Sequence, residues 1–522
     1  MDNAVIADLL AEREISEQLL NYCRGIDRLD RALLASVWHA SGTADYGNVG
    51  EKKPVQNVIE ELIQKYTPFA FHHHNVMHPL LRIEGDKAVS ETSVIAILRT
   101  NSEEEGQLRD EHQRIRFLDQ WSRRAGRWAL DHRIVVLTTI WEQSPVSGVT
   151  GTLTKRDHTD PGYAHLGSLG GDGVFATKAE SLADLRAERD IRRLFATYSR
   201  GVDRFDPDIW KLAWHDDATL SYETGKLDGT AHDMVFLMTF GHYPWAAHQH
   251  QSTRAAIRVC GDSAVSETLN LAMLHGYIDP AGISVQDHYR GRYLDTWERR
   301  NGTWAIKHRF TPRGCMWQQS VKSEVSAFMR RDRSDPSYAL FASFETGEQD
   351  DLAILVGEQA IRAQLQTYCR ALDRLDMPLL RSVWCPSGRL VDRTRAMDGD
   401  ASVMNYCIMG ELANWAASAH HTTLTMIDIN DDKAVSETYF ENTLIQHPEK
   451  EGIATNRNVR GRYLDRWSQR EGLWALEYRE ILLDFVWEEQ VTNLFPTQAA
   501  IRDQTDSSYS LFAGKFSLGR QA

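Results

Sequence analysis

The stretch "YCRGIDRLD" at residues 22–30 recurs twice along the chain, as "YSRGVDRFD" at 198–206 and "YCRALDRLD" at 368–376. The copies are offset by 176 and then by 170 residues. The same two offsets relate the copies of two further motifs: "GDKAVSET" (85–92), "GDSAVSET" (261–268) and "DDKAVSET" (431–438), and "RIRFLDQWSRRAGRWAL" (114–130), "RGRYLDTWERRNGTWAI" (290–306) and "RGRYLDRWSQREGLWAL" (460–476). Constant offsets over this length indicate tandem duplication of a whole domain.

The length of the chain agrees with this reading, because 522 residues suggest about three domains at roughly 150 residues each. A period near 170 residues is too long for a solenoid repeat, so each copy is expected to have its own core. Each copy ends in a related tail: "RDHTDPGY", "RDRSDPSY" and "RDQTDSSY". The stretches "HLGSLGGDG" (165–173) and "FETGEQDD" (344–351) are predicted linkers. The predicted domains are therefore 1–168, 175–344 and 350–522.

The composition excludes several classes of protein. With 42% hydrophobic and 25% charged residues the chain is typical of a soluble globular protein. A net charge of −14 argues against nucleic acid or an anionic membrane as the main partner. No apolar run approaches the roughly 20 residues of a membrane span, and the acidic N-terminus does not resemble a secretory signal. Six scattered cysteines without a CxxC pair favour reduced thiols, so we expect a cytoplasmic protein.

The order of elements within one copy predicts an α+β fold. Ile15, Leu19, Tyr22 and Ile26 recur at helical spacing, which predicts an amphipathic helix. A shorter helix around "RALLASVW" follows, with Asp30 in the position of an N-cap. The remainder is rich in β-branched and aromatic residues separated by turns such as "EGDK" and "RRAGR". Helices followed by a run of antiparallel strands are typical of the α+β class.

The segment "FHHHNVMH" at 71–78 raises the question of a metal site. When the copies are aligned on the GD turn, only one histidine position is kept in all three: His74, His250 and His420. A zinc site needs three or four ligands in fixed geometry, so no metal is predicted. A single repeated histidine fits proton transfer, because imidazole titrates near neutral pH. The alternative is a strand histidine that only hydrogen-bonds a neighbouring backbone group.

An aspartate accompanies this histidine in every copy: Asp27, Asp203 and Asp373. It lies beside the apolar stripe of the first helix, where an unpaired carboxylate would be costly. It could form an ion pair with Arg24 or Arg28, or it could orient the histidine as in other acid–base pairs. The repeated Asp30, Asp206 and Asp376 are explained by helix capping alone.

Four more positions recur with the pair. They are a tyrosine of the first helix (Tyr22, Tyr198, Tyr368), a tryptophan (Trp38, Trp214, Trp384), a second tyrosine (Tyr46, Tyr222) and an arginine after the hairpin (Arg133, Arg309, Arg479). In the third copy Asp392 replaces the second tyrosine, which is expected to put a carboxylate beside the Asp–His pair and makes that site the most doubtful. Strict alternation along "HNVMHPLLRIE" puts His74 on the face of Arg82 and Glu84, so either a bulge intervenes or the cavity face is polar.

These motifs together resemble the SnoaL-like branch of the nuclear transport factor 2 (NTF2)-like superfamily, in three tandem copies. The resemblance rests on the helix that ends in "RGIDRLD", the histidine before "GDKAV" and the "RYLD-W-x-R-x-G-x-W" hairpin. It implies a curved antiparallel sheet wrapped by helices into a cone with an apolar pocket. Several members of the family are homotrimers, so three fused copies imply a single-chain pseudo-trimer.

The resemblance also implies roles for the repeated residues. Members such as scytalone dehydratase, bile-acid 7α-dehydratase and hexachlorocyclohexane dehydrochlorinase use an Asp–His pair supported by tyrosines or an arginine. The implied catalytic residues are Asp27, His74, Asp203, His250, Asp373 and His420. The implied substrate-binding residues are Tyr22, Trp38, Tyr46, Arg133, Tyr198, Trp214, Tyr222, Arg309, Tyr368, Trp384 and Arg479.

The chemistry expected of this set is an elimination that needs no cofactor. The chain has no Walker-type, Rossmann or GxSxG motif, so nucleotide, dinucleotide and acyl-serine chemistry are not supported. We expect a lyase, specifically a dehydratase of a small hydroxylated aromatic or polycyclic compound. Dehydrohalogenation, carbon–carbon cleavage with loss of formaldehyde, and ketone isomerisation or cyclisation would use the same residues. A non-catalytic small-molecule-binding protein is the remaining alternative.

Overall fold

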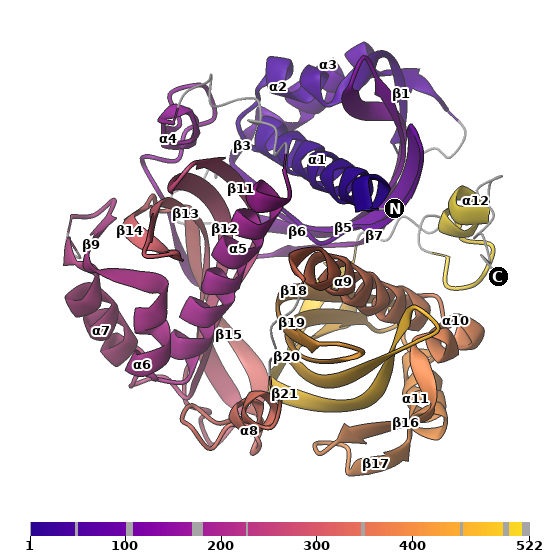
Figure 1. Cartoon of the computed structure of the whole chain (residues 1–522). Helices are drawn as coiled ribbons and strands as arrows, with labels where there is room; N and C mark the ends of the chain where they lie inside the picture. Colours follow the sequence, from indigo (N-terminus) through magenta and orange to yellow (C-terminus); the bar gives the residue numbers. More distant parts are fainter. Residues whose placement is uncertain are drawn as a thin grey trace.

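The computed structural model describes residues 2–46, 51–100, 108–169, 181–225, 228–345, 350–448, 453–493 and 501–513. The elements occur in the same order in each third of the chain (Figure 1). The predicted α+β class is confirmed. Of the two predicted linkers, residues 170–173 and 346–349 lie outside the described residues, whereas His165 to Gly167 end a short helix.

The first repeat contains α1 (Asp2–Asp27), α2 (Arg31–Ser36), β1 (Trp38–Tyr46), β2 (Lys53–Pro54), α3 (Val55–Tyr66), β3 (Phe69–Val76), β4 (Leu80–Glu84), β5 (Lys87–Thr100), β6 (Asp110–Arg124), β7 (Arg127–Gln143), β8 (Ser147–Thr150) and α4 (Pro161–Gly167). The second contains α5 (Leu182–Asp203), α6 (Pro207–Trp210), η1 (Lys211–Ala213), β9 (Trp214–Tyr222), β10 (Gly229–Thr230), α7 (Ala231–Gly241), β11 (Ala247–Cys260), β12 (Ser263–His275), β13 (Ile283–Arg300), β14 (Thr303–Thr311), β15 (Cys315–Val325) and α8 (Pro336–Ala342). The third contains α9 (Asp351–Asp373), α10 (Met377–Ser382), β16 (Trp384–Asp392), β17 (Met397–Asp400), α11 (Ala401–Leu412), β18 (Ala417–Asn430), β19 (Lys433–Ile445), β20 (Ile453–Arg470), β21 (Leu473–Asn493) and α12 (Ser507–Ala513).

The first helix of each repeat packs its apolar stripe on the curved sheet. In α1 the four predicted core residues Ile15, Leu19, Tyr22 and Ile26 are all buried. The helix stops before Asp30, which caps α2 by accepting a hydrogen bond from the Leu33 N–H at 2.9 Å. Capping removes one unsatisfied backbone donor and fixes the sharp turn between the two helices.

Two features of each repeat differ from the simple expectation of helices followed by antiparallel strands. A third helix (α3, α7 or α11) lies between the first strand and the long strands. The first strand also pairs in parallel with the last long strand, so that Ala44 lies opposite Arg133. The long strands are antiparallel to one another, as predicted. The parallel pair closes one edge of the sheet around the helix.

A bulge settles which face of the sheet His74 occupies. His74 lies opposite Ala96 of β5, but Leu80 lies opposite Glu91, so one extra residue separates β3 from β4. The corresponding register shift falls between Ser252 and Ala255 in the second repeat. An inserted residue reverses the alternation of side chains. His74 therefore shares the face of Leu81 and Ile83, not that of Arg82 and Glu84.

The three repeats close into a ring. Strand β8 pairs with β15, β15 pairs with β21, and β21 pairs with β7, so hydrogen-bonded strands connect every pair of repeats. Helices α1, α5 and α9 contact one another near the centre of the molecule (Figure 1). No helix in the described part of the chain is both long and apolar enough to cross a membrane.

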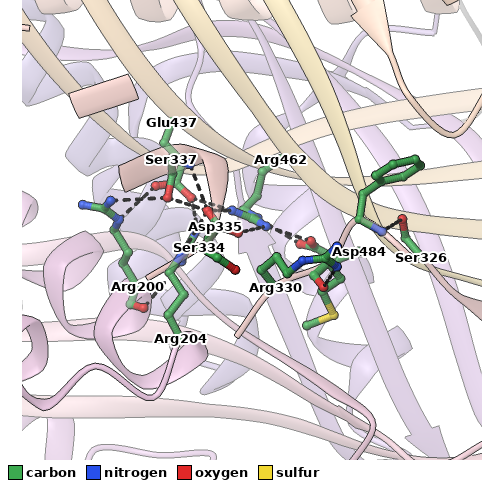
Figure 2. A network of polar contacts seen from close by, with 12 residues as sticks. Arg200, Arg204, Ser326, Arg330, Ser334, Asp335, Ser337, Glu437, Arg462 and Asp484 are labelled. Atoms are coloured by element: carbon green, nitrogen blue, oxygen red, sulfur yellow. Dashed lines mark hydrogen bonds and ion pairs between the residues drawn. The ribbon is translucent and has the colours of Figure 1, made fainter. Parts of the chain in front are cut away.

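Buried ion pairs connect each repeat to the next. At the boundary between the second and third repeats, Arg462 binds Asp335 at 2.8 Å, Glu437 at 3.1 Å and Asp484 at 3.1 Å, and Arg204 binds Glu437 (Figure 2). Burial alone would raise the pKa of Asp335, but Arg462 and Arg204 outweigh it and lower that pKa. The equivalent groups at the other two boundaries are Arg28, Asp160, Glu267 and Arg292, and Arg374, Asp506, Glu91 and Arg116.

Removing one member of this network should destabilise the protein strongly. We expect Arg462→Met to reduce the free energy of unfolding by about 3–5 kcal/mol, because three buried carboxylates each lose one cationic partner. Denaturant unfolding measures this. Arg31→Met is the control, since the Arg31–Glu60 pair is exposed and such pairs contribute little. Equal effects of the two substitutions would contradict the structural role given to the network.

Candidate active sites

The structure brings the predicted aspartate and histidine together in every repeat. The distance from the histidine Nδ1 to the aspartate Oδ1 is 2.7 Å for His74 and Asp27, 2.7 Å for His250 and Asp203, and 2.6 Å for His420 and Asp373. The backbone N–H of each histidine also donates to the same carboxylate, at 3.2, 3.1 and 3.0 Å. The aspartate is the last residue of the first helix, and the histidine lies on the strand beneath it.

These contacts determine how the histidine can act. Burial alone would raise the pKa of Asp27, but His74 and His72 outweigh it and lower that pKa. Burial would also raise the pKa of Asp373, but His420 outweighs it and lowers that pKa. An ionised carboxylate accepts from Nδ1–H, which leaves the lone pair of the ring on Nε2. The Nε2 atom of His74 is buried and has no hydrogen-bond partner among the described residues.

The repeated arginine occupies a buried ion pair within the same core. Arg133 binds Asp119 through Nε at 2.6 Å and Nη2 at 2.8 Å, and its guanidinium lies 4.2 Å from the ring centre of Tyr22. Burial raises the pKa of Tyr22 despite the opposing effect of Arg133. The other repeats reproduce the pairing, with Arg309 on Asp295 and Arg479 on Asp465. The arginines therefore face the interior rather than water.

The predicted aromatic residues lie in the same buried clusters. Tyr22 and Trp38, Tyr198 and Trp214, and Tyr368 and Trp384 belong to the three domain cores. The hydroxyl of Tyr46 hydrogen-bonds the hydroxyl of Tyr22, whereas the hydroxyl of Tyr222 contacts Met238 Sδ at 2.9 Å. The second tyrosine position thus has a different polar partner in each of the first two repeats.

Asp392 contacts the turn that follows it. Its carboxylate binds Arg395 at 2.7 Å and accepts from the backbone N–H groups of Thr394 and Arg395. The prediction that this residue places a carboxylate beside the third Asp–His pair has no support in these contacts, because they turn it toward the adjoining turn. The third site instead lacks a tyrosine hydroxyl at this point.

The surroundings of the histidine differ among the repeats. Tyr66 lies 5.5 Å from His74 between ring centres, and His242 lies 5.1 Å from His250, while Leu412 occupies the equivalent position in the third repeat. The side chain of the pair histidine is 2% exposed in the first repeat, 10% in the second and 6% in the third. The first site is therefore the most enclosed.

A second arginine, from the tail of the repeat, supports the pair. Arg156 contacts Nε2 of His72 at 2.8 Å, and Nδ1 of His72 lies 3.4 Å from Asp27. In the third repeat Arg502 donates to Ser418, which donates to Asp373 at 2.9 Å. The arginine begins the repeated tail motif, but its role was missed because its partner lies 84 residues away in sequence. The Asp119 position was missed too, although it is part of the repeated "RYLD" motif.

One group in the first repeat has the composition of a metal site. Ligand atoms of Asp27, His72 and His74 lie within 4.8 Å of one another. The donation from Arg156 to His72 uses one ring nitrogen and places a positive charge beside the group, which disfavours a cation. Ser418 replaces His72 in the third repeat. A cavity of about 90 Å³ reaches Asp27 and His72 from the boundary with the second repeat.

The fold and the pairs define a class: a cone-shaped α+β domain with a hydrogen-bonded Asp–His pair between its first helix and its sheet. Three stretches, 7–134, 183–310 and 355–480, match the SnoaL-like domain family, and together they span more than half of the chain. The chain therefore belongs to the SnoaL-like family, in three tandem copies. No curated protein matches it.

Several solved structures resemble single repeats. A candidate scytalone dehydratase from Novosphingobium aromaticivorans is 21% identical, and the match covers 28% of this chain and 92% of that one, with a TM-score of 0.23. The hexachlorocyclohexane dehydrochlorinase LinA-type3 from Novosphingobium barchaimii is 18% identical, covering 28% and 96%, with a TM-score of 0.23. A variant of a protein of unknown function from Mycobacterium tuberculosis is 19% identical, covering 36% and 95%, with a TM-score of 0.22.

The lowered pKa values of Asp27 and Asp373 predict a pH dependence of stability. A carboxyl whose folded pKa lies below its unfolded value of about 3.9 stabilises the fold above that value, and the contribution is lost as the pH falls toward the folded pKa. We expect Asp27→Asn/Asp373→Asn to destabilise the protein more at about pH 6 than at about pH 3. Denaturant unfolding of both proteins at each pH measures the difference. A difference independent of pH would contradict ionised pairs.

Proposed function

We propose that the protein is a cofactor-independent lyase that removes water from a small hydroxylated aromatic or polycyclic compound. The observation that carries the proposal is the Asp–His hydrogen bond of 2.6 to 2.7 Å, which is built identically in all three repeats. A protein that only binds a ligand does not need the aspartate and the histidine to stay in register while Tyr66 is replaced by histidine and leucine in the other two copies.

The proposed reaction begins at Nε2 of the histidine. Nε2 takes the proton from the carbon next to the carbon that carries the hydroxyl, and the electrons of that C–H bond form the new double bond. The C–O bond breaks, and the hydroxyl leaves as water after receiving a proton from the imidazolium or a tyrosine. The aspartate holds Nδ1–H and stabilises the imidazolium, a role that contributes typically 10²–10⁴-fold to the rate, to order of magnitude.

The remaining repeated residues are assigned to substrate binding. Nε and Nη2 of Arg133 are held by Asp119, so Nη1 remains for a developing oxyanion on the substrate. Tyr22 keeps its proton because its pKa is raised, and it can donate to a leaving oxygen. Aromatic side chains around the pair favour a flat apolar substrate. Nucleic acid is not a proposed partner, and the cytoplasm is the proposed location.

The first experiment is mass spectrometry of the full-length protein incubated with pooled hydroxylated aromatic and polycyclic metabolites. We expect one compound to lose water, and we expect the variant Asp27→Asn/Asp203→Asn/Asp373→Asn to slow this loss by roughly 10²–10⁴-fold. The matched control is Asp30→Asn/Asp206→Asn/Asp376→Asn, because asparagine is an equally good helix cap and these residues do not contact His74, His250 or His420.

The outcomes separate the competing functions. Loss of chloride or formaldehyde in place of water would still assign catalysis to the Asp–His pair, but the reaction would be a dehydrohalogenation or a carbon–carbon cleavage. If the wild type and the Asp27→Asn/Asp203→Asn/Asp373→Asn variant formed equal amounts of product, the Asp–His pairs would have no part in the reaction. A metabolite that stays bound to both proteins without turnover would support a binding protein. Activity that disappears on chelation would favour the Asp27–His72–His74 group as a metal site.

The three sites should differ in activity. Variants that keep one aspartate and carry asparagine at the other two isolate each site. We expect the order second repeat, third repeat, first repeat, because the exposed fractions of the histidine side chains are 10%, 6% and 2%. Steady-state kinetics on the substrate identified above measures this order. A first-repeat variant as active as the second would show that access does not limit the reaction.

A further inference from the structure

A second candidate site lies at the centre of the molecule, away from the Asp–His pairs. Helices α1, α5 and α9 meet near the centre of the ring of repeats (Figure 1). Residues of all three helices line a cavity of about 170 Å³. Equivalent positions of all three repeats line it, among them Leu9, Leu185 and Leu355. One water needs about 10–15 Å³ by this measure, so the cavity can hold several waters or one small organic ion.

The lining of this axial cavity is rich in charged residues. They are Arg13, Arg189, Arg192, Arg254 and Arg362, with Glu12, Glu188 and Glu358. Arg13 also binds Glu17 at 2.7 Å and Arg189 also binds Asp190 at 3.2 Å, so these two arginines have carboxylate partners beyond the lining. His78 also lines the cavity, and burial lowers its pKa, so it adds no charge near neutral pH.

The glutamates are already occupied. Glu188 binds Arg13 at 3.0 Å and Arg192 at 2.7 Å. Glu358 binds Arg189 at 2.8 Å and lies 3.5 Å from Arg362.

The third glutamate, Glu12, makes no ion pair with an arginine of the described residues. It accepts a hydrogen bond from the Gln359 amide, and it lies 3.6 Å from His78. Burial raises the pKa of Glu12 despite the nearby arginines. One arginine of the lining is therefore left without a carboxylate at ion-pair distance.

That arginine is Arg254. It comes from the bulge of β11, and its side chain makes no ion pair or hydrogen bond with a described residue. Burial and the neighbouring Arg192 lower its pKa to about 9, although Glu12 and Glu188 act in the opposite direction. The equivalent residues of the other repeats are His78 and Leu424, so one copy alone contributes this cation.

We propose that the axial cavity binds a small oxyanion, a phosphate or a short dicarboxylate, with Arg254 as its principal ligand. A guanidinium presents paired N–H groups that match two oxygens of a carboxylate or phosphate. Such an anion would give Arg254 the ion-pair partner that no carboxylate of the described residues provides. The volume restricts the ligand to a few heavy atoms, which excludes a nucleotide or a polymer.

Isothermal titration calorimetry of the full-length protein with inorganic phosphate, and separately with malonate, tests the proposal. We expect saturable binding of one anion per chain and at least a tenfold weaker affinity in Arg254→Leu. Leucine already occupies this position in the third repeat, so the variant should fold, and circular dichroism checks this. Arg254→Gln provides a second, polar variant. Arg31→Gln, an exposed arginine, is the control for net charge.

Each outcome bears on the proposal. Binding of phosphate alone, malonate alone or both, with loss in either Arg254 variant and not in Arg31→Gln, supports it and identifies the preferred oxyanion. The absence of saturable binding of both anions to the wild type overturns it. Unchanged affinity in the Arg254 variants also overturns it, because the anion would then lie elsewhere. None of these results depends on the proposed lyase activity.

Discussion

Two adjacent residues at the end of the first helix, Asp27 and Arg28, hold each repeat together and join it to the next. Asp27 accepts from both the ring and the backbone of His74, so it fixes the helix against its own sheet. Arg28, the next residue, binds Glu267 of the second repeat at 2.5 Å. Because adjacent residues make these two contacts, the position of the Asp–His pair is coupled to the boundary between repeats.

This coupling explains why the surroundings of the pair extend beyond one domain. The tail of the first repeat brings Arg156 to His72 and Asp160 to Arg292 of the second repeat. A charge buried at such a boundary is tolerable only with a complete set of partners. The tail therefore makes two kinds of contact. Its Asp160 pairs with the buried arginine at the boundary, and its Arg156 holds His72, which lies beside Asp27.

Much of this arrangement could be predicted from the sequence, because the three copies act as an internal comparison. The Asp27–His74 contact and the Asp30 cap follow from residues that recur at fixed offsets. The bulge after Val76 was one of two alternatives that the sequence left open, because alternation alone does not show whether an extra residue is inserted. The orientation of Asp392 could not be predicted either, because it depends on an ion pair with Arg395, three residues further along the turn.

The single chain allows an asymmetry that a trimer of identical subunits cannot have. Arg114, Arg290 and Arg460 occupy one equivalent position in the three repeats, and all are buried. Glu441 binds Arg114 at 3.0 Å and Arg460 at 2.5 Å, but its equivalents are Ile95 and Leu271. In a homotrimer a glutamate here would appear three times or not at all. Fusion permits one carboxylate among three arginines, just as it permits one Arg254, so the charge along the axis can be adjusted one residue at a time.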